Sequence, residues 1–350
     1  MKILINTPDL SLSGGVANHY KGLLNFWKQD ISYNFIGSRR GIPGRVLLLF
    51  DLLKFIILCA FGEYDLILLN PSLGTKAIKR DSLYLKISNI FKIKTVVFIH
   101  GWENKMERKI SRNPEPFIRA YDRADAFIVL AHKFKNHMIN WGITRPIHLS
   151  TTKVDDHLLR NFDLSKKNPD NITILFLARI EENKGILIAL KAFEQVVSKY
   201  PEAQLKVAGN GSALRQAQIL VSEKSIRNVE FLGNISGSEL IESFGSSMIY
   251  ILPTQHGEGM PTSILEAMAF GLPIISRPVG GLVDFFEEEK MGYLIQDIIP
   301  NHYSSKIIEL IENPEKTRAI GQYNYEFAQK QFLASKVVLQ LENILLNIGK

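Results

Sequence analysis

Two glutamates, Glu258 and Glu266, lie eight residues apart in a stretch that begins as a polar loop and continues with apolar residues at helical spacing. Pro261 suits the first turn of that helix, because its missing N–H would have no partner there. Gly271 suits the position just after the helix end, where a left-handed backbone is common. The helix start offers free N–H groups, and the carboxylates accept hydrogen bonds from hydroxyl groups. The stretch therefore predicts a site for an anionic, hydroxyl-rich ligand.

Two cations occupy the first loop of the second half of the chain. Arg179 and Lys184 follow the apolar run 172–178, which is typical of a buried strand. An arginine fork and a lysine point charge at the carboxyl end of a strand suit a diphosphate group. Either cation alone could be an ordinary surface residue, and their shared loop favours the binding role. Gly209 opens another helix and allows the backbone to approach a ligand closely.

The first half has two further candidate ligand positions. Gly14 and Gly15 follow the apolar run 2–6 and open a helix, although the third glycine of the dinucleotide fingerprint is absent. His100 directly follows the β-rich run 95–99, and side chains at the carboxyl ends of parallel strands commonly face ligands. A plain tight turn and a structural histidine are the alternatives. We favour the ligand-binding interpretation for both, because each follows a predicted strand.

Apolar runs alternate with helical stretches along the whole chain, which predicts an α/β fold with parallel sheets wrapped by helices. The polar run Ser165–Asn171 contains a proline and separates two such halves. We expect one domain at 1–165, a second at 166–331, and an amphipathic helix within 332–350. The expected strands are 2–6, 31–37, 65–70, 95–99, 126–130, 146–149, 172–178, 204–208, 229–232, 249–252 and 273–276.

Positive charge is concentrated in the first half of this 350-residue chain, whose net charge is +7. Residues 1–165 hold 24 Lys or Arg against 14 Asp or Glu, a net +10, and the remainder holds 18 against 21, a net −3. A basic half favours an anionic partner surface. No helix-turn-helix, zinc-ligand or aromatic RNA-binding motif accompanies the charge, so we favour an anionic membrane leaflet over nucleic acid. Scattered solvated lysines are the alternative.

The most apolar stretch, Val46–Phe61, is shorter than an ordinary transmembrane span of about 20 residues, and Asp51 and Lys54 interrupt it. We expect a buried core helix; an interfacial helix with arginines at its entry is the alternative. These arginines are Arg39, Arg40 and Arg45. The single cysteine, Cys59, excludes an intrachain disulfide framework and favours a reducing compartment. We therefore expect a cytoplasmic protein, with the inner face of the cell membrane as a peripheral location.

Together these motifs resemble the signature of retaining glycosyltransferases of the GT-B fold, the large family-4 group. The motifs are Gly14-Gly15, His100-Gly101, Arg179…Lys184-Gly185, Gly209-Asn-Gly211, Glu258-Gly-Met-Pro, Leu265-Glu266-Ala-Met-Ala and Gly271-Leu-Pro. The resemblance covers nearly the whole chain. It implies two Rossmann-like domains that face each other across a cleft, the first binding the acceptor and the second the nucleotide sugar. It also implies that the final helix crosses back onto the first domain.

The resemblance further implies a role for each motif. Arg179 and Lys184 would hold the diphosphate and stabilise its leaving charge. Glu266 would bind the ribose, Glu258 would hold the transferred sugar, and His100 would lie near the reacting carbon. Pro261 has no N–H to offer, so backbone contacts would come from its neighbours. The other expected donor contacts are Gly15, Gly209, Gly233, Asn234, Gly259, Met260 and Thr262.

No Asp-x-Asp motif occurs, so we expect no divalent metal and no cofactor, with leaving charge met by the cations and by helix N-termini. The expected reaction is hexosyl transfer with retention from a nucleotide sugar to a hydroxyl of a lipid-linked or growing surface-polysaccharide saccharide. The alternatives are a sugar-nucleotide epimerase on a similar scaffold and a non-catalytic nucleotide-sugar binding module.

Overall fold

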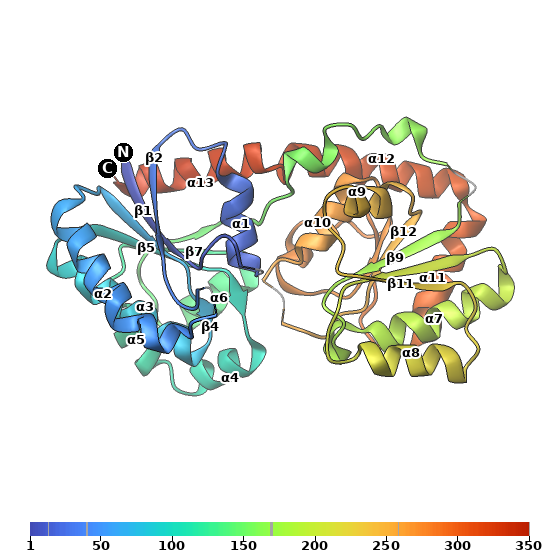
Figure 1. Cartoon of the computed structure of the whole chain (residues 1–350), viewed down its shortest axis with the longest axis horizontal. Helices are drawn as coiled ribbons and strands as arrows, with labels where there is room; N and C mark the ends of the chain where they lie inside the picture. Colours follow the sequence, from blue (N-terminus) through green and yellow to red (C-terminus); the bar gives the residue numbers. More distant parts are fainter. Residues whose placement is uncertain (13, 40, 169–170, 258, 350) are drawn as a thin grey trace. The chain divides into compact units, whose positions relative to one another are not determined.

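The computed structural model describes residues 1–12, 14–39, 41–168, 171–257 and 259–349 (Figure 1). Its contacts divide the chain into two compact units, each built on a six-stranded parallel sheet. The first unit comprises Met1–Lys153 and Ala334–Gly349, together with Gly257, Gly259 and Met260. The second unit comprises Val154–His256 and Pro261–Leu333. The predicted α/β fold class is thereby confirmed.

The two units use a similar alternation of strands and helices. The first contains β1 (Lys2–Thr7), α1 (Gly15–Leu23), β2 (Asp30–Phe35), α2 (Gly44–Phe61), β3 (Leu66–Leu69), β4 (Ser72–Leu73), α3 (Thr75–Ile90), β5 (Lys94–Ile99), β6 (Gly101–Trp102), α4 (Asn104–Arg112), α5 (Glu115–Tyr121), β7 (Ala126–Val129), α6 (His132–Asn140), β8 (Ile147–Leu149) and α13 (Ala334–Gly349). The second contains η1 (Asp156–Leu159), η2 (Leu164–Lys166), β9 (Thr173–Leu177), η3 (Glu182–Lys184), α7 (Ile186–Lys199), β10 (Gln204–Ala208), α8 (Leu214–Glu223), β11 (Val229–Gly233), α9 (Gly237–Gly245), β12 (Ile249–Leu252), α10 (Thr262–Ala269), β13 (Ile274–Ser276), η4 (Gly280–Asp284), β14 (Gly292–Leu294), α11 (Pro300–Glu312) and α12 (Pro314–Gln331).

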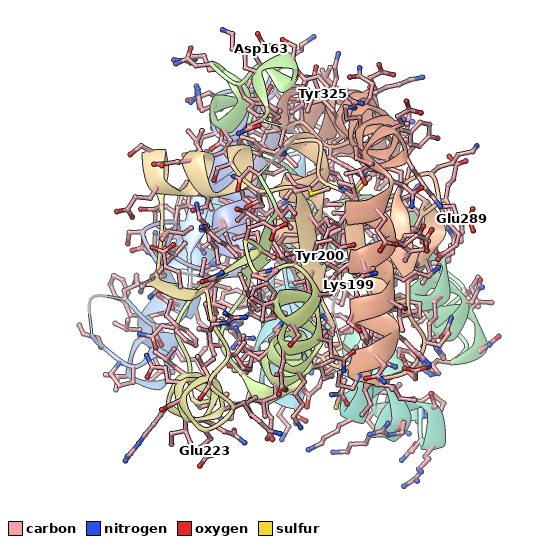
Figure 2. The ribbon with its side chains drawn as sticks, turned by 90° about the vertical axis from the view of Figure 1, so that its right-hand side faces the viewer. Asp163, Lys199, Tyr200, Glu223, Glu289 and Tyr325 are labelled. Atoms are coloured by element: carbon pink, nitrogen blue, oxygen red, sulfur yellow. The ribbon has the colours of Figure 1, made fainter. Side chains whose placement is uncertain are left out.

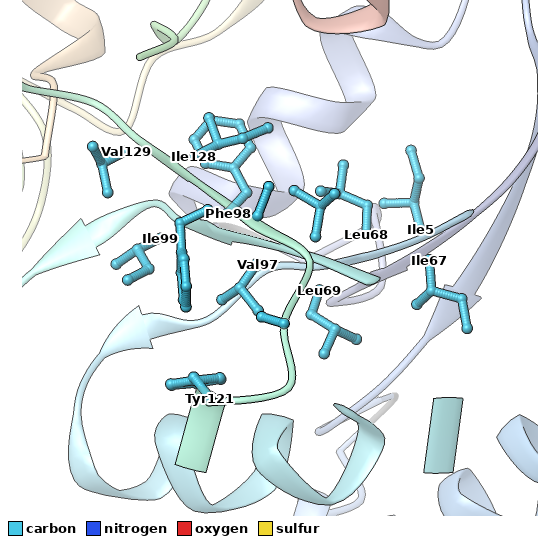
Figure 3. Close-up of a cluster of buried hydrophobic side chains, with 14 of the residues drawn as sticks. Ile5, Ile67, Leu68, Leu69, Val97, Phe98, Ile99, Tyr121, Ile128 and Val129 are labelled. Carbon is cyan, nitrogen blue, oxygen red and sulfur yellow. The ribbon is translucent and has the colours of Figure 1, made fainter. Parts of the chain in front are cut away.

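The sheet of the first unit has the strand order β2-β1-β3-β5-β7-β8. Its central strands β3 and β7 are buried along their whole length, because helices cover both faces. Helices α2, α3 and α5 lie on one face of this sheet, while α1 and α13 cover the other (Figure 1). The core between these layers is aliphatic and aromatic, with Leu68, Val97 and Phe98 among its members (Figure 3).

The last helix, α13, packs on the first unit, which confirms the expected return of the chain. Glu342 on α13 accepts hydrogen bonds from the backbone N–H groups of Lys28 (2.6 Å) and Gln29 (2.8 Å). Lys94 Nζ donates to the carbonyl oxygen of Ile348 over 2.9 Å. The apolar face of α13 completes the core beside α1.

The sheet of the second unit has the order β11-β10-β9-β12-β13-β14. Helices α7 and α11 pack against each other on one face, and α10 and α12 pack together. At the end of α7, Lys199 and Tyr200 lie next to each other (Figure 2) and both donate to Glu312 of α11. These contacts join α7 and α11 in the outer helical layer, away from the carboxyl ends of the strands.

The structure adds three short strands that the sequence did not predict, β4, β6 and β14. Each has only two or three residues, too few for a periodic signal. The units also change at Lys153–Val154, before the polar run Ser165–Asn171. Val154 N–H donates to the carbonyl oxygen of Phe332 over 2.7 Å, so the chain joins the second unit before that run begins.

Helix α2 is not the buried core helix that its composition predicts. Among the α2 side chains that the structure describes, three are buried: Asp51, Phe55 and Cys59. The arginine expected at the helix entry, Arg39, turns inward and forms an ion pair with Asp51, and Arg40 lies outside the described residues. Six apolar side chains form an exposed stripe, which we call the outer stripe: Val46, Leu49, Phe50, Leu53, Ile57 and Phe61. Within the described ranges, none of the helices combines the length and the apolar character that crossing a bilayer requires.

Candidate functional site

In the second unit, the strand order reverses between β9 and β12, and the loops that follow these two strands meet. Gln255 N–H donates to the carbonyl oxygen of Asn183 over 2.7 Å. The Asn183 amide nitrogen lies 3.2 Å from Nδ1 of His256. Open α/β sheets bind ligands at the carboxyl ends of strands where the order reverses. This edge of the second unit is therefore its candidate site.

Arg179 and Lys184 both stand in the loop after β9, where the sequence placed them. The Arg179 side chain is 64% exposed and donates to Glu181 over 2.8 Å. Lys184 ends η3 and is only 7% exposed. Gly185 follows with φ +83°, and a Cβ there would lie 2.3 Å from the carbonyl oxygen of Pro253, just after β12. This close approach, which only glycine permits, places Lys184 at the point where the strand order reverses.

The predicted glycine loop after β10 packs on protein backbone. Gly209 has φ +131°, and a Cβ there would lie 1.9 Å from the carbonyl oxygen of Ala178. A Cβ at Gly211 would lie 2.3 Å from the carbonyl oxygen of Ile180. Since the loops after β9 and β10 touch at these points, the glycines are required for the packing of the two loops. The ligand-approach interpretation is not needed to explain them.

Two further expected positions stand after β11. Gly233 has φ +69° with open space where a Cβ would point, and its carbonyl oxygen accepts from Gly209 N–H over 2.6 Å. Asn234 follows and is exposed. They lie beside the glycine loop, so the candidate site continues along the carboxyl edge of the sheet from β9 to β11.

Helix α10 begins at Thr262, so Pro261 is the residue before the helix and lies outside its first turn. Ser263 Oγ lies 2.7 Å from the hydroxyl of Tyr250, which ties the helix start to β12. Glu266 is half-buried in the second turn. The helix ends as predicted, with Gly271 at φ +67° after the last turn. Thr262 and Glu266 thus belong to the same edge as the two cations.

Part of the acidic loop before α10 clusters with the first unit. Gly259 is buried, and a Cβ there would lie 2.1 Å from the carbonyl oxygen of His100. Met260 packs on the core of that unit. Glu258 lies outside the described residues, so its expected contact with the sugar stays a prediction.

In the first unit, a hydrogen-bond network fixes His100 at the end of β5. Asn70 directly follows β3, and its Nδ2 donates to the carbonyl oxygens of Asn6 (2.9 Å) and Leu68 (3.2 Å). Its Oδ1 is therefore the acceptor, lying 2.6 Å from the hydroxyl of Tyr20 and 3.0 Å from His100 Nε2. Nε2 of His100 must carry the ring proton, which leaves Nδ1 as a hydrogen-bond acceptor.

His100 and the neighbouring His19 are both held neutral. Burial, with a smaller contribution from the charge of Lys153, lowers the pKa of His19 to about 3. Burial also lowers the pKa of His100 well below its ordinary value, with a further contribution from His19, whose ring centroid lies 5.0 Å away. Gly15 begins α1 with nothing near its Cβ position. The carboxyl edge of this sheet therefore presents a neutral imidazole near an open helix start.

The sequence did not identify Asn70, Tyr20 or His19 as neighbours of His100. The detectable signal was an asparagine directly after the strand expected at 65–70, but only the strand order makes β3 and β5 adjacent. Within the described ranges, no group of three or more His, Cys, Asp or Glu side chains is placed to hold a metal ion.

Residues 160–327 match the family model of group 1 glycosyl transferases. Most of the second unit is therefore similar to group 1 glycosyl transferases. Among relatives, an uncharacterized glycosyltransferase of Methanocaldococcus jannaschii, MJ1178, is 27% identical over 170 residues, or 49% of this chain and 46% of the relative. The putative colanic acid biosynthesis glycosyltransferase WcaL of Salmonella typhimurium is 21% identical over 220 residues, or 61% of this chain and 54% of WcaL. The chain thus spans about half the length of these curated relatives.

The two units together match solved structures. Anabaena Alr3699/HepE, crystallised in complex with UDP, superimposes with a TM-score of 0.81 over 99% of this chain and 100% of that chain, at 17% identity. At this identity the likeness concerns the fold. It confirms the GT-B architecture that the sequence motifs implied.

Proposed function

We propose that the protein transfers a hexose from a nucleoside diphosphate sugar to a hydroxyl group of a saccharide or glycolipid. The observation that carries this proposal is the buried Lys184, close in the sequence to Arg179, where the strand order of the second unit reverses. In the reaction, the bond between the anomeric carbon and the phosphate oxygen breaks, and the nucleoside diphosphate leaves with the bonding electrons. The acceptor oxygen bonds to the anomeric carbon and loses its proton. The two cations suit the charge that develops on the leaving diphosphate.

The other contacts with the nucleotide sugar come from residues at the carboxyl edge of the sheet. Glu266, inside α10, accepts hydrogen bonds from the ribose hydroxyls, and Glu258 accepts from the transferred sugar. The backbone at Gly233 and Asn234 borders the base, and Thr262 and its neighbours offer N–H groups at the start of α10. Because Pro261 precedes α10 and has no N–H, it contributes none of these donors.

The first unit supplies the acceptor side and one group near the reacting carbon. His100 is neutral, with its proton on Nε2, so Nδ1 can accept a hydrogen bond from a sugar hydroxyl without adding charge. Gly15 leaves open space at the start of α1 for a phosphate or an acceptor hydroxyl. The carbonyl oxygen of His100 lies against Gly259, which brings the acidic loop into the first unit.

We also propose that the reaction retains the anomeric configuration and requires no divalent metal. Two cations and the N-terminus of α10 can compensate the negative charge of the diphosphate, which is the role that a divalent metal would otherwise have. Retention follows from the family-4 resemblance of the motifs around Glu258 and Glu266. A UDP-sugar is the first donor to test, since HepE was crystallised with UDP.

The acceptor class and the location are proposals of the same kind. WcaL is described as a putative colanic acid biosynthesis enzyme, which supports a surface-polysaccharide saccharide as acceptor. The net +10 of residues 1–165 supports a peripheral position on an anionic membrane surface inside the cell.

The test begins with thermal-shift screening of UDP-, GDP- and ADP-sugars, because a ligand at 100 times its dissociation constant adds about 2.7 kcal/mol of stability. The best donor is then incubated with saccharide acceptors, and the anomeric configuration of the product is read by NMR. Lys184→Ala should abolish transfer while the fold survives. Lys191→Ala, on the exposed side of α7, is the matched control and should leave transfer unchanged. Normal transfer by the Lys184 variant would contradict the proposal.

Two other outcomes would replace the proposal. Conversion of the nucleotide sugar to its epimer without acceptor would identify an epimerase. Binding of the nucleotide sugar with neither transfer nor hydrolysis, across a panel of acceptors, would identify a binding module.

A further inference from the structure

Helix α2 has an inverted arrangement of polar and apolar side chains. Its buried Asp51 faces the protein interior, where it pairs with Arg39 and accepts from Gly37 N–H over 3.0 Å. Its outer stripe is entirely apolar, with Leu49 76% exposed and Phe61 81% exposed. A helix that faces water carries charged residues outside and apolar residues inside. The exterior of α2 therefore matches an apolar environment.

The neighbouring helix α3 adds cations beside this apolar stripe. The two helices lie side by side, and the Phe55 and Tyr84 rings meet edge to face with centroids 4.9 Å apart (Figure 1). The exposed residues of α3 are Thr75, three lysines (Lys76, Lys79 and Lys86) and the apolar Leu83 and Ile90. An apolar helix face with a cationic border is typical of helices that lie in the interface of an anionic bilayer.

A groove continues the cationic border between α3, α4 and α5. Its volume is about 650 Å³, and apolar side chains such as Met106 and Phe117 line it together with cations. The cations that line it are Lys79, Lys86, Lys109 and Arg119, and the acidic Glu115, which also lines it, pairs with Arg119. A second hollow beside it is lined by Lys105, Arg108, Lys109, Arg112 and Asn113. An apolar floor with a cationic rim suits the phosphate and glycerol of a lipid headgroup.

Three acidic side chains in this region are occupied by other contacts, and Glu103, directly before α4, is exposed. Asp81 on α3 is buried and accepts from Arg80 over 2.6 Å. Glu107 on α4 accepts from the indole N–H of Trp102 over 2.6 Å. Glu115 on α5 accepts from Arg119 over 2.8 Å. The exposed charge of α3 and α4 is therefore strongly positive.

We propose that the first unit docks on an anionic lipid bilayer through this surface. The outer stripe of α2 enters the boundary between headgroups and acyl chains, and the groove between α3, α4 and α5 receives an anionic lipid headgroup. The inference deepens the proposed peripheral location and rests on it, because docking would hold the first unit at the surface where a lipid-linked acceptor resides.

A second copy of the chain is a poorer occupant of the same surface. A symmetric dimer through α2 would bring the cationic borders of two first units together, and like charges at an interface oppose association. An anionic bilayer meets both the apolar stripe and its cationic border. The α2 helix, at 18 residues, is about 27 Å long and lies along the surface without spanning it.

Vesicle flotation of the full chain tests the proposal. Vesicles of phosphatidylcholine are compared with vesicles that also contain 30 mol% phosphatidylglycerol, at low and high salt. The first variant, Leu49→Ser with Leu53→Ser, removes apolar area from exposed positions. Its control, Ile139→Ser with Ile219→Ser, does the same on α6 and α8. The charge variant is Lys86→Glu with Lys109→Glu, with Lys224→Glu and Arg227→Glu in the second unit as control.

We expect the wild-type chain to float with the anionic vesicles, less at high salt, and to stay in solution with phosphatidylcholine alone. The Leu49/Leu53 and Lys86/Lys109 variants should each lose about tenfold or more in vesicle partition, and both controls should bind like the wild type. Equal binding by either docking variant, or no flotation of the wild type, would overturn the proposal. Light scattering that shows a wild-type dimer, which the leucine variant converts to a monomer, would assign the stripe to self-association instead.

Nucleotide binding separates failure of docking from failure of the proposed function. Each docking variant should bind UDP as the wild type does, because the substitutions lie in the first unit, on helices that supply no donor contact. Lys184→Met should bind UDP about 10 to 100 times more weakly and keep vesicle flotation. If docking holds while UDP binding is absent in every protein, the proposed function fails and the docking surface stands.

Discussion

Asn70 Oδ1 lies 3.0 Å from His100 Nε2, across the carboxyl ends of neighbouring strands β3 and β5. The orientation of the Asn70 amide is fixed, because its nitrogen donates to two backbone carbonyl oxygens. The histidine must therefore present Nε2–H to Asn70, and Nδ1 remains the acceptor. Tyr20 donates to the same oxygen over 2.6 Å, which strengthens the assignment.

Replacing Asn70 by aspartate should raise the pKa of His100. A carboxylate at this distance favours the imidazolium form and should raise the pKa by about one to three units above its lowered wild-type value. NMR titration of labelled histidine rings measures this shift directly. Asn70→Ser, which introduces no charge, serves as the control. An unchanged His100 titration in the aspartate variant would contradict the hydrogen-bond assignment.

His19 makes the stability of the first unit sensitive to acid. Its pKa is about 3 in the fold and ordinarily 6.5, so the unfolded chain binds more protons between these values. The stabilisation is complete above pH 6.5 and is lost as the pH falls toward 3. The free energy of unfolding should drop by about 2 kcal/mol between pH 6.5 and 5 from this group alone.

Urea unfolding followed by tryptophan fluorescence measures this loss. All three tryptophans, Trp27, Trp102 and Trp141, lie in the first unit, so the signal reports on that unit. The His19→Gln variant should show a shallower decline of stability with acidification than the wild type. An identical decline in both proteins would show that His19 is not the group responsible.

Gly209→Ala should destabilise the second unit more than Gly233→Ala does. Both glycines have positive φ, which costs an alanine about 1–2 kcal/mol. At Gly209 the added Cβ would also lie 1.9 Å from the carbonyl oxygen of Ala178, whereas at Gly233 the space is open. Thermal unfolding followed by circular dichroism compares the two. Equal melting temperatures would mean that the loops after β9 and β10 relax without loss.

Chelation should leave sugar transfer unchanged. If Arg179, Lys184 and the start of α10 carry the leaving charge, dialysis against EDTA removes nothing that the reaction needs. Transfer rates before and after dialysis, with and without added Mg²⁺, provide the measurement. A loss that Mg²⁺ restores would assign part of the charge stabilisation to a metal.

The strands were predictable because each is a short, nearly continuous apolar run between turn residues, as at 95–99 and 204–208. The cations after β9 were predictable for the same reason, since a strand end fixes the edge on which the next residues lie. Such runs do not specify the order of the strands in the sheet. The pairing of Asn70 with His100 depends on β3 and β5 being neighbours, and no local pattern specifies that.

The exposed stripe of α2 shows a different limit of sequence patterns. A helix with apolar residues on all sides is ordinarily buried, so Val46–Phe61 predicted a core helix. Composition does not distinguish burial in protein from contact with another apolar phase. The distinguishing feature is that Asp51 faces inward to Arg39, and this contact emerges only in the folded chain.

The central claim is that the second unit binds a nucleoside diphosphate where its strand order reverses, with Lys184 as a direct partner. Calorimetric titration of UDP into the wild type, Lys184→Met and Lys191→Met tests it most directly. Methionine keeps much of the buried volume and removes the charge, whose hydrogen bond to a phosphate is worth about 1.5–3 kcal/mol. We predict affinity about 10 to 100 times weaker for Lys184→Met and unchanged for Lys191→Met. Equal UDP affinity in all three proteins would contradict the account.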